Sequence, residues 1–471
     1  MILGDLLKTH GFRLTLLSSL GLFQTIAASQ SLDDAIRSAL VQYPTIIAAQ
    51  ARLDASRNDI IRAQGQHFPQ ISWQGTSSNY SGVNARGGPA ASGLLPDNTW
   101  IQSPNVTFNI WSGGRIQADV DRSKSTSIAR FNQQRLTRDE VALLALEGYM
   151  NWARGLALVD LAQTNVKAHQ RILNDVKKIT QVDQGRMIDQ DQAEVRFENA
   201  VLTLKLRETE LAVARQRLER MLLGAAPAKP LGIDHLRGDL PTTAQIAVAQ
   251  INDSHPAIAV QLAQINAARA SLDAARSQYS PTVDLSYGKQ FTQGTGQGDY
   301  ITQVSINFPI FSGGATVGAV GSASNELLAT QQGLSEARII LRERVLSIWP
   351  ELQSARSRKE LALRQAETGI KLVAGYEQQF RIGRRSLLDL LTVQNDLFSY
   401  QSNATIAAFE ERVAKGRLLA AIGKLAIAYQ TAQPSTEDQN AGYSGSLLGA
   451  LKQSGASKLA SPIQQPAPIA P

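Results

Sequence analysis

The sequence predicts a mainly α-helical fold with a small β part, built from two related halves. Three observations support this fold class. Motifs of the first half recur in the same order in the second, strand-like alternation is confined to one region of each half, and the remaining stretches are long and nearly free of proline. Aromatic residues form only 6% of the 471 residues, which suits helices that pack through small side chains.

The N-terminus has the features of a secretory signal peptide. Lys8 and Arg13 precede an apolar run over residues 14–28 that ends in small residues, the order expected of a basic region, an apolar region and a cleavage site. We therefore expect residues 1–29 to be removed on export; a buried N-terminal helix is the alternative. No further apolar run of about 18 residues follows, so any membrane span is expected to use strands.

Paired motifs indicate an internal duplication. A helix is expected to begin near Pro44 and again near Pro256, because proline is tolerated in the first helical turn. A Ser-Gly-Gly motif that ends at Gly114 recurs at Gly314. The first copy is longer between these motifs, in a stretch rich in glycine and proline (82–96) that predicts a loop.

Each copy carries two segments in which apolar residues alternate with Ser, Thr and Asn. In the second copy, for example, Val304 and Ile306 flank Ser305. Period two with one apolar face predicts a strand whose apolar face contacts either a protein core or lipid. A soluble sandwich is the alternative, but two distant strand pairs would make a poor one. The expected strands are about 68–80, 100–111, 281–291 and 300–311.

Two long helices are predicted in each copy, joined by a short turn. The segment 114–183 contains no proline and would extend roughly 100 Å as a helix, and its counterpart 314–381 is interrupted only by Pro350, which is expected to kink it. The return helices are expected at about 188–223 and 386–429. Because the turns are short, each pair is expected to form an antiparallel hairpin.

Heptad spacing in the return helices indicates coiled-coil packing. Leucine and alanine recur every seven residues from Leu390, with Glu411 as the one polar member of the row. Asp189 with Gln192, and Ser386 with Asp389, have the spacing of reciprocal capping residues. The predicted organisation is therefore a first repeat over 30–223, a linker over 224–241, a second repeat over 242–430 and a disordered tail over 431–471.

Four strands are too few to close a transmembrane barrel, and an open sheet edge is not tolerated in lipid. We therefore expect several copies to pool their strands. A barrel continued by a ring of helical hairpins would form a tube.

The duplicated halves, the two strand pairs, the Ser-Gly-Gly helix entries and the glycine-bearing hairpin turns together resemble the TolC family of outer membrane efflux and secretion proteins, over about Ser31 to Tyr429. The resemblance implies a homotrimer whose twelve-stranded β-barrel, four strands from each chain, lies in outer-membrane lipid and continues into an antiparallel coiled-coil α-barrel in the periplasm. It implies an exit duct that docks to a periplasmic adaptor and an inner-membrane ABC or proton-driven transporter.

The family's functional residues carry over at two places. The hairpin turns resemble tips on which adaptors dock, which implicates Gly185, Arg186, Gly383 and Arg384; their plain role is to end helices. Just inside the tips the family closes its aperture with ion pairs and hydrogen bonds. The matching positions are Asp191, Arg385 and Asp389, with Phe380 where an aromatic hydroxyl is expected and Thr392 where a carboxylate is expected.

Composition excludes several other functions. The net charge is +7, but basic and acidic residues alternate along the helices, so we expect no nucleic-acid partner. The five histidines have no metal-ligand spacing and no phosphate-binding loop occurs, so we expect no enzyme, no metal and no cofactor. The chain has no cysteine and hence no lipid anchor on that residue; this, with the aperture, favours type I secretion over drug efflux. A periplasmic coiled-coil adaptor is the alternative function.

Overall fold

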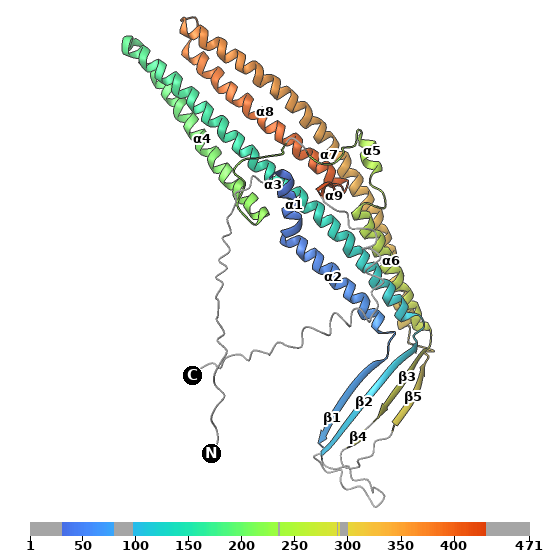
Figure 1. Cartoon of the computed structure of the whole chain (residues 1–471). Coiled ribbons are helices and arrows are strands. Elements are labelled where there is room, and N and C mark those ends of the chain that lie inside the picture. The colour runs from blue at the N-terminus through green and yellow to red at the C-terminus, as the bar shows by residue number, and fades with distance from the viewer. Residues whose placement is uncertain (1–30, 80–97, 234–235, 290, 293–299, 430–471) are drawn as a thin grey trace, which may run out of the picture.

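A computed structural model describes residues 31–79, 98–233, 236–289, 291–292 and 300–429 of the chain. The predicted signal peptide, the C-terminal tail and the glycine-rich loop lie outside these residues. Long helices run side by side along most of the length, with the strands at one end and two helical hairpin tips at the other (Figure 1).

Two pairs of long helices form the body. In the first repeat α3 (Arg115–Val182) is joined by the 3-10 helix η2 (Gln184–Arg186) to α4 (Met187–Leu222). In the second, α7 (Ala315–Arg381) turns directly into α8 (Leu387–Ala421). α7 is continuous through Pro350, so the predicted interruption does not end the helix there.

Shorter helices complete each repeat. α2 (Pro44–Gly65) and α6 (Pro256–Arg276) begin at the two prolines that the sequence indicated, and η3 (Ser277–Tyr279) follows α6. Three more short helices are present: α1 (Leu32–Gln42), α5 (Ala244–Ala249) and α9 (Leu425–Tyr429). The helix expected over 386–429 is therefore two helices, because Gly423 adopts φ 70° and ends α8.

The strands form one antiparallel sheet in the order β1-β2-β3-β5. Its members are β1 (Gln70–Asn79), β2 (Asn98–Trp111), β3 (Thr282–Lys289) and β5 (Tyr300–Asn307), with the two-residue β4 (Phe291–Thr292) paired to β2. The strand expected to reach residue 311 ends at Asn307, where its partner β3 also begins at Thr282. Pro309 just beyond has no N–H with which to extend the ladder.

The two repeats enter their long helices with the same backbone geometry. Gly113 and Gly114 have φ 63° and 90°, and Gly313 and Gly314 have φ 62° and 86°. In both motifs the preceding serine hydroxyl accepts a hydrogen bond of 3.3 Å from a backbone N–H in the first turn of the following helix. This agreement confirms the internal duplication.

The main core lies where the shorter elements pack on α3 and α8. Tyr149 of α3 is fully buried, and its hydroxyl donates to the carbonyl of Leu231 and accepts from the backbone N–H of the same residue. Buried residues of α1, α8 and α9 join it in one cluster. We call α1, α9 and residues 224–233 the belt, because all three contribute to this one cluster against α3 and α8.

The structure corrects one predicted polar role and explains a second polar residue. Helix α4 begins at Met187, so Asp189 lies in its first turn and pairs with Arg186 at 2.7 Å instead of forming a cap with Gln192. Glu411, the polar member of the heptad row, is buried between two lysines: its side chain is 7% exposed and lies 2.9 Å from the Lys359 ammonium and 2.7 Å from that of Lys415. Burial raises the pKa of Glu411, but the two lysine hydrogen bonds outweigh it and hold the pKa below its usual value.

Candidate functional site

One face of the sheet is apolar and largely exposed. Directly paired residues of neighbouring strands lie on the same face of a sheet, and the register puts Ile71 opposite Val106, and Val106 opposite Tyr287. The exposed fraction is 82% for Ile71, 67% for Trp73 and 71% for Ile306. The apolar sheet face consists of Ile71, Trp73, Val106, Phe108, Val283, Leu285, Tyr287, Val304 and Ile306.

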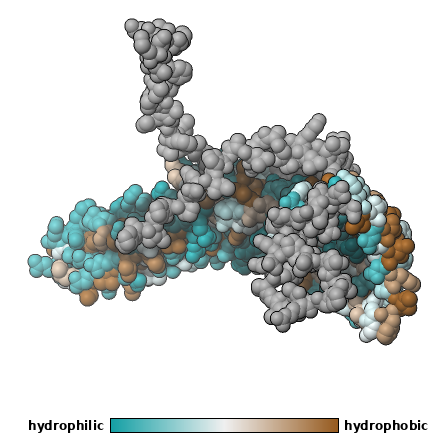
Figure 2. All heavy atoms as spheres, turned by 90° about the horizontal axis from the view of Figure 1, so that it is seen from below, coloured by the Kyte–Doolittle hydropathy of each residue, from teal (hydrophilic) through white to brown (hydrophobic). Residues whose placement is uncertain are grey.

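The opposite face of the sheet is polar. The side-chain amide of Asn109 donates to the carboxylate of Asp284 at 2.7 Å across the β2–β3 pair, and Thr107, Ser286 and Gln303 belong to the same face. Figure 2 shows apolar residues gathered at the end of the molecule that carries the strands, whereas the hairpin end is mostly hydrophilic. The sheet therefore has one apolar and one polar face.

The sheet is also open at both edges. Among the described residues β1 pairs only with β2, and β5 pairs only with β3. Both edges thus carry backbone N–H and C=O groups that are free to pair with another strand.

The two hairpin tips have different backbones. In the first, Asp183 accepts a hydrogen bond of 3.1 Å from the N–H of Gly185, which lies inside η2 without a positive φ. In the second, Gly383 has φ 71°, and the N–H of Arg384 bonds the carbonyl of Gln379, so that α7 ends in a Schellman-type turn. The left-handed glycine expected at both tips is therefore present at the second alone.

Arg385 is the best-connected residue of the predicted aperture. Its Nε donates to Oε1 of Gln379 at 3.0 Å, and its guanidinium lies 4.6 Å from the ring centre of Tyr376. A carboxylate oxygen of Asp389 is 3.9 Å away, and the N–H of Asp389 donates to the hydroxyl of Ser386. The structure thus brings Arg385 and Asp389 together at the start of α8.

Asp191 and Thr392, the other polar residues predicted for the aperture, form no hydrogen bond or ion pair with Arg385 or Asp389. Asp191 is exposed on α4 and forms no ion pair with a described residue. The hydroxyl of Thr392 donates to the carbonyl of Leu388 in its own helix at 2.7 Å. In a single chain, the two hairpins therefore share no hydrogen bond through these side chains.

An apolar cluster links the two hairpins near their tips. Phe380 packs against buried residues of α3, α4 and α8. Tyr376, one helical turn earlier, belongs to the same cluster and supplies an aromatic hydroxyl close to the place where the sequence lacks one; its spacing of four residues from Phe380 was the available signal. The buried members are Ile172, Leu173, Val176, Ala193, Leu387, Leu390 and Leu391.

Two kinds of site are not found in the part of the chain that the structure describes. None of its helices has both the length and the hydropathy to cross a membrane. It also contains no group of three or more His, Asp or Glu side chains positioned to hold a metal ion.

The chain matches the family model described as outer membrane efflux protein over residues 35–224 and 247–424. It is 24% identical to outer membrane efflux protein BepC of Brucella suis over 433 residues, which cover 90% of this chain and 92% of that protein. It is 20% identical to outer membrane protein TolC of Vibrio cholerae, covering 87% and 94%. The solved structure of VceC from Vibrio cholerae superposes with a TM-score of 0.70 at 16% identity, covering 83% of this chain and 96% of that one.

Sequence and fold thus agree. The matched relatives are named as outer membrane proteins, and these names fit a protein that combines an apolar sheet face with long helical hairpins. The resemblance to the TolC family is confirmed, the localisation is the outer membrane, and the chain belongs to the outer membrane efflux protein family.

Proposed function

We propose that this efflux channel is a passive homotrimeric exit duct of a tripartite system, opened at its periplasmic end by an adaptor and an inner-membrane transporter. The observation that carries the proposal is the sheet with an apolar face and two open edges. An unpaired edge costs several kcal/mol per polar group in lipid, so strands of other copies must satisfy β1 and β5.

Three copies with four main strands each would give a twelve-stranded barrel. The apolar sheet face would contact lipid, and the polar face with Asn109 and Asp284 would line a water-filled channel. The hairpins of α3–α4 and α7–α8 would continue the wall into the periplasm. Transport through such a duct needs no catalytic group, since the driving force comes from the partner transporter.

The aperture is proposed to close at the hairpin tips. Phe380 and Tyr376 would hold the hairpins of one chain together, whereas Arg385, Asp389, Asp191 and Thr392 would face neighbouring copies. The Arg385–Asp389 pair is exposed and contributes about 1 kcal/mol or less. Several such contacts are therefore weak enough to yield when an adaptor docks on the tips at Gly185, Arg186, Gly383 and Arg384.

Drug efflux is the form of transport that the names of two relatives favour. Outer membrane efflux protein BepC and a probable efflux pump outer membrane protein of Pseudomonas putida each match most of the chain's length. Type I secretion is the second candidate, and the chain's lack of cysteine is the observation in its favour. Co-purification with an adaptor and either an ABC or a proton-driven transporter distinguishes the two.

Conductance in planar bilayers tests the duct and its gate. We expect purified protein to form channels of low conductance, and Arg385→Ala combined with Asp389→Ala to raise that conductance because the closed tips lose their polar contacts. The matched control is Glu360→Ala with Arg364→Ala, which removes an exposed ion pair of 2.7 Å from α7, away from the hairpin tip. Equal conductance of both double variants would remove Arg385 and Asp389 from the gate, and a monomer that needs no detergent would refute the channel.

A further inference from the structure

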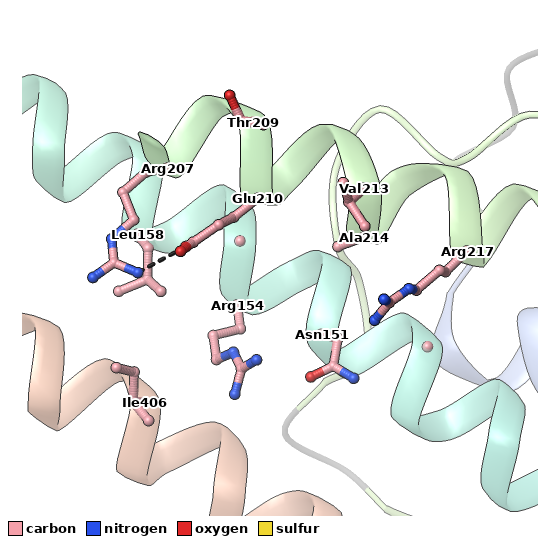
Figure 3. A pocket seen from close by; sticks show the side chains of 12 residues that line it. Asn151, Arg154, Leu158, Arg207, Thr209, Glu210, Val213, Ala214, Arg217 and Ile406 are labelled. Atoms are coloured by element: carbon pink, nitrogen blue, oxygen red, sulfur yellow. Dashed lines mark hydrogen bonds and ion pairs between the residues drawn. The ribbon is translucent and has the colours of Figure 1, made fainter. Parts of the chain in front are cut away.

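A cavity of about 530 Å³ lies on the long helices at the level of the belt. α3 forms its floor, α4 one wall and Ile406 of α8 the other (Figure 3). This volume is within the range of small-molecule sites. No residue assigned to the tips, the aperture or the sheet contributes to it.

The cavity combines apolar walls with an excess of positive charge. Leu158, Val213 and Ala214 supply apolar surface. Three arginines from two helices reach it, but only one carboxylate does. The charged members are Arg154, Arg207, Arg217 and Glu210.

Most of this positive charge is not neutralised within the cavity. Nη1 of Arg207 donates to Glu210 at 2.7 Å, but its buried Nε has no hydrogen-bond partner. Neither Arg154 nor Arg217 forms an ion pair with any carboxylate of the described residues. Figure 3 shows Arg154 and Arg217 extending on the same side of α3, near Asn151.

The arginines next to the cavity are paired with glutamates, so they do not add to the excess of positive charge. A second pocket shares Asn151 and Arg154 with the first and contains three glutamates. Its other arginines are engaged: Arg417 bonds Glu147 and Glu351, each at 2.8 Å, and Arg358 bonds Glu410 at 3.0 Å. The donors without a carboxylate partner are therefore Arg154 of α3, which lines both pockets, and Arg217 and Nε of Arg207 of α4, which line the first cavity.

The cavity opens away from the belt. Tyr149 marks the belt side of α3, and Leu158, nine residues later, lies about 180° round the helix from it. The belt would obstruct the bore of the proposed tube if it lay inside it. In the assembled tube the belt is therefore outside, and the cavity, on the opposite side of α3, faces the bore. This step, unlike the charge and shape of the cavity, rests on the proposed function.

We infer that this cavity binds organic anions that carry an apolar body, with one site in each subunit. Arg154, Arg217 and Nε of Arg207 would bind a carboxylate or sulfonate by charge-assisted hydrogen bonds. Leu158, Val213 and the opposite side chain of Ile406 would cover the apolar part. Anionic amphipathic compounds would then bind in the wall of the duct, midway along its length.

Calorimetric titration of the purified full-length protein in detergent tests the site. Naphthalene-2-sulfonate is the probe, and naphthalen-2-ylmethylammonium is its cationic match. We expect the sulfonate to bind and the cation not to bind. Arg154→Gln with Arg217→Gln should weaken sulfonate binding at least about tenfold, since two charged donors are lost. The control Arg57→Gln with Arg62→Gln removes the same charge from exposed positions on α2 and should change affinity less than about twofold.

A cavity-filling variant separates shape from charge. A Cβ at Gly148 would meet only Met221 Cγ, at 4.0 Å, so Gly148→Leu should fold and occupy the cavity while leaving every arginine in place. We expect it to abolish binding as well. Equal binding of both probes, no sulfonate binding, or full binding by the arginine variant with a native melting profile would overturn the site.

Channel recordings distinguish failure of the anion site from failure of the proposed duct. Sulfonate on the periplasmic side should reduce the current of wild-type channels and leave that of Gly148→Leu unchanged. Channels without sulfonate binding would overturn the site alone, whereas binding by a protein that forms no channel would overturn the duct alone.

Discussion

At the residue scale, Asp139 is a buried carboxylate in the middle of α3. Its exposed fraction is 5%, and its Oδ1 accepts a hydrogen bond of 2.7 Å from the N–H of Ala426 in α9. Burial raises the pKa of Asp139 to about 6, against the lowering effects of the Ala426 hydrogen bond and of Arg135 and Arg138. The folded protein therefore holds a proton on Asp139 more tightly than the unfolded chain does.

Replacing Asp139 by asparagine is expected to change the pH dependence of stability. A raised carboxyl pKa stabilises the folded state fully below about pH 4 and progressively less as the pH rises to about 6, with a total change of about 3 kcal/mol. Asparagine keeps the acceptor for Ala426 and removes the titration. The melting temperature of Asp139→Asn should exceed that of the wild type at pH 7, and the gap should close at pH 4.

The matched control is Asp160→Asn, an exposed position on the same helix. It should follow the wild-type melting curve at both pH values. A gap between Asp139→Asn and the wild type that is the same at pH 4 and pH 7 would show that titration of Asp139 does not contribute.

Residue-scale contacts were the least predictable from sequence. The spacing of Ser386 and Asp389 correctly predicted half of a cap, since the serine accepts from Asp389. The burial of Glu411 and Asp139 depends on which helices lie against α8 and α3, and one chain's periodicity does not give that information. The predicted aperture residues stay a prediction, because their partners would belong to other copies.

At the element scale, Gly423 decides where α8 ends. The N–H of Lys424 bonds the carbonyl of Leu419 across the left-handed glycine, as Arg384 does with Gln379 at the second tip. Both turns have the sequence isoleucine, glycine, basic residue. That shared signal was available in the sequence, but the heptad rows, which continue into α9 at Leu425, hid the break.

Alanine at position 423 is expected to destabilise the protein. A left-handed non-glycine residue costs roughly 1–2 kcal/mol, and the new Cβ would lie 2.9 Å from Pro256 Cδ, closer than atoms tolerate. The melting temperature should fall by several degrees. Gly375→Ala on α7 has open space around it and helical backbone, so it should be neutral or stabilise slightly; similar losses for both would contradict the role assigned to Gly423.

The long elements were predictable because their signals extend over many residues. Long segments with at most one proline predicted α3 and α7, and heptad spacing predicted the return helices, although α8 ends at Ala421 and not at 429. Alternation predicted the four main strands. The ends of strands were less certain, since β5 stops with its partner β3 rather than with its own alternation, which continues to Ile310.

At the scale of the whole molecule, the two faces of the sheet predict opposite responses to charge. Val304 of β5 is on the apolar face and 58% exposed, whereas its neighbour Gln303 is on the polar face. Arginine on a lipid-facing position near the bilayer midplane costs about 2–4 kcal/mol, and arginine on the channel side is tolerated. Val304→Arg should therefore deplete the heat-modifiable oligomer of the outer-membrane fraction, and Gln303→Arg should leave it intact.

Equal recovery of the Val304→Arg and Gln303→Arg oligomers would contradict the assignment of the apolar sheet face to lipid. Their pairing across strands, with Leu285 opposite Val304 and Ser286 opposite Gln303, keeps both variants in the same local backbone. The comparison thus isolates the environment of the face from the folding of the strand.

The unequal hairpin tips have a consequence for whatever grips the end of the duct. If three copies assemble as proposed, the η2 turn of the first tip and the left-handed glycine turn of the second would alternate around the end of the tube. In a trimer the rim then repeats every 120°, not every 60°. A partner that recognises only one kind of tip could then dock in three rotational orientations. The unlike tips would thus fix the rotation of the docked partner relative to the duct.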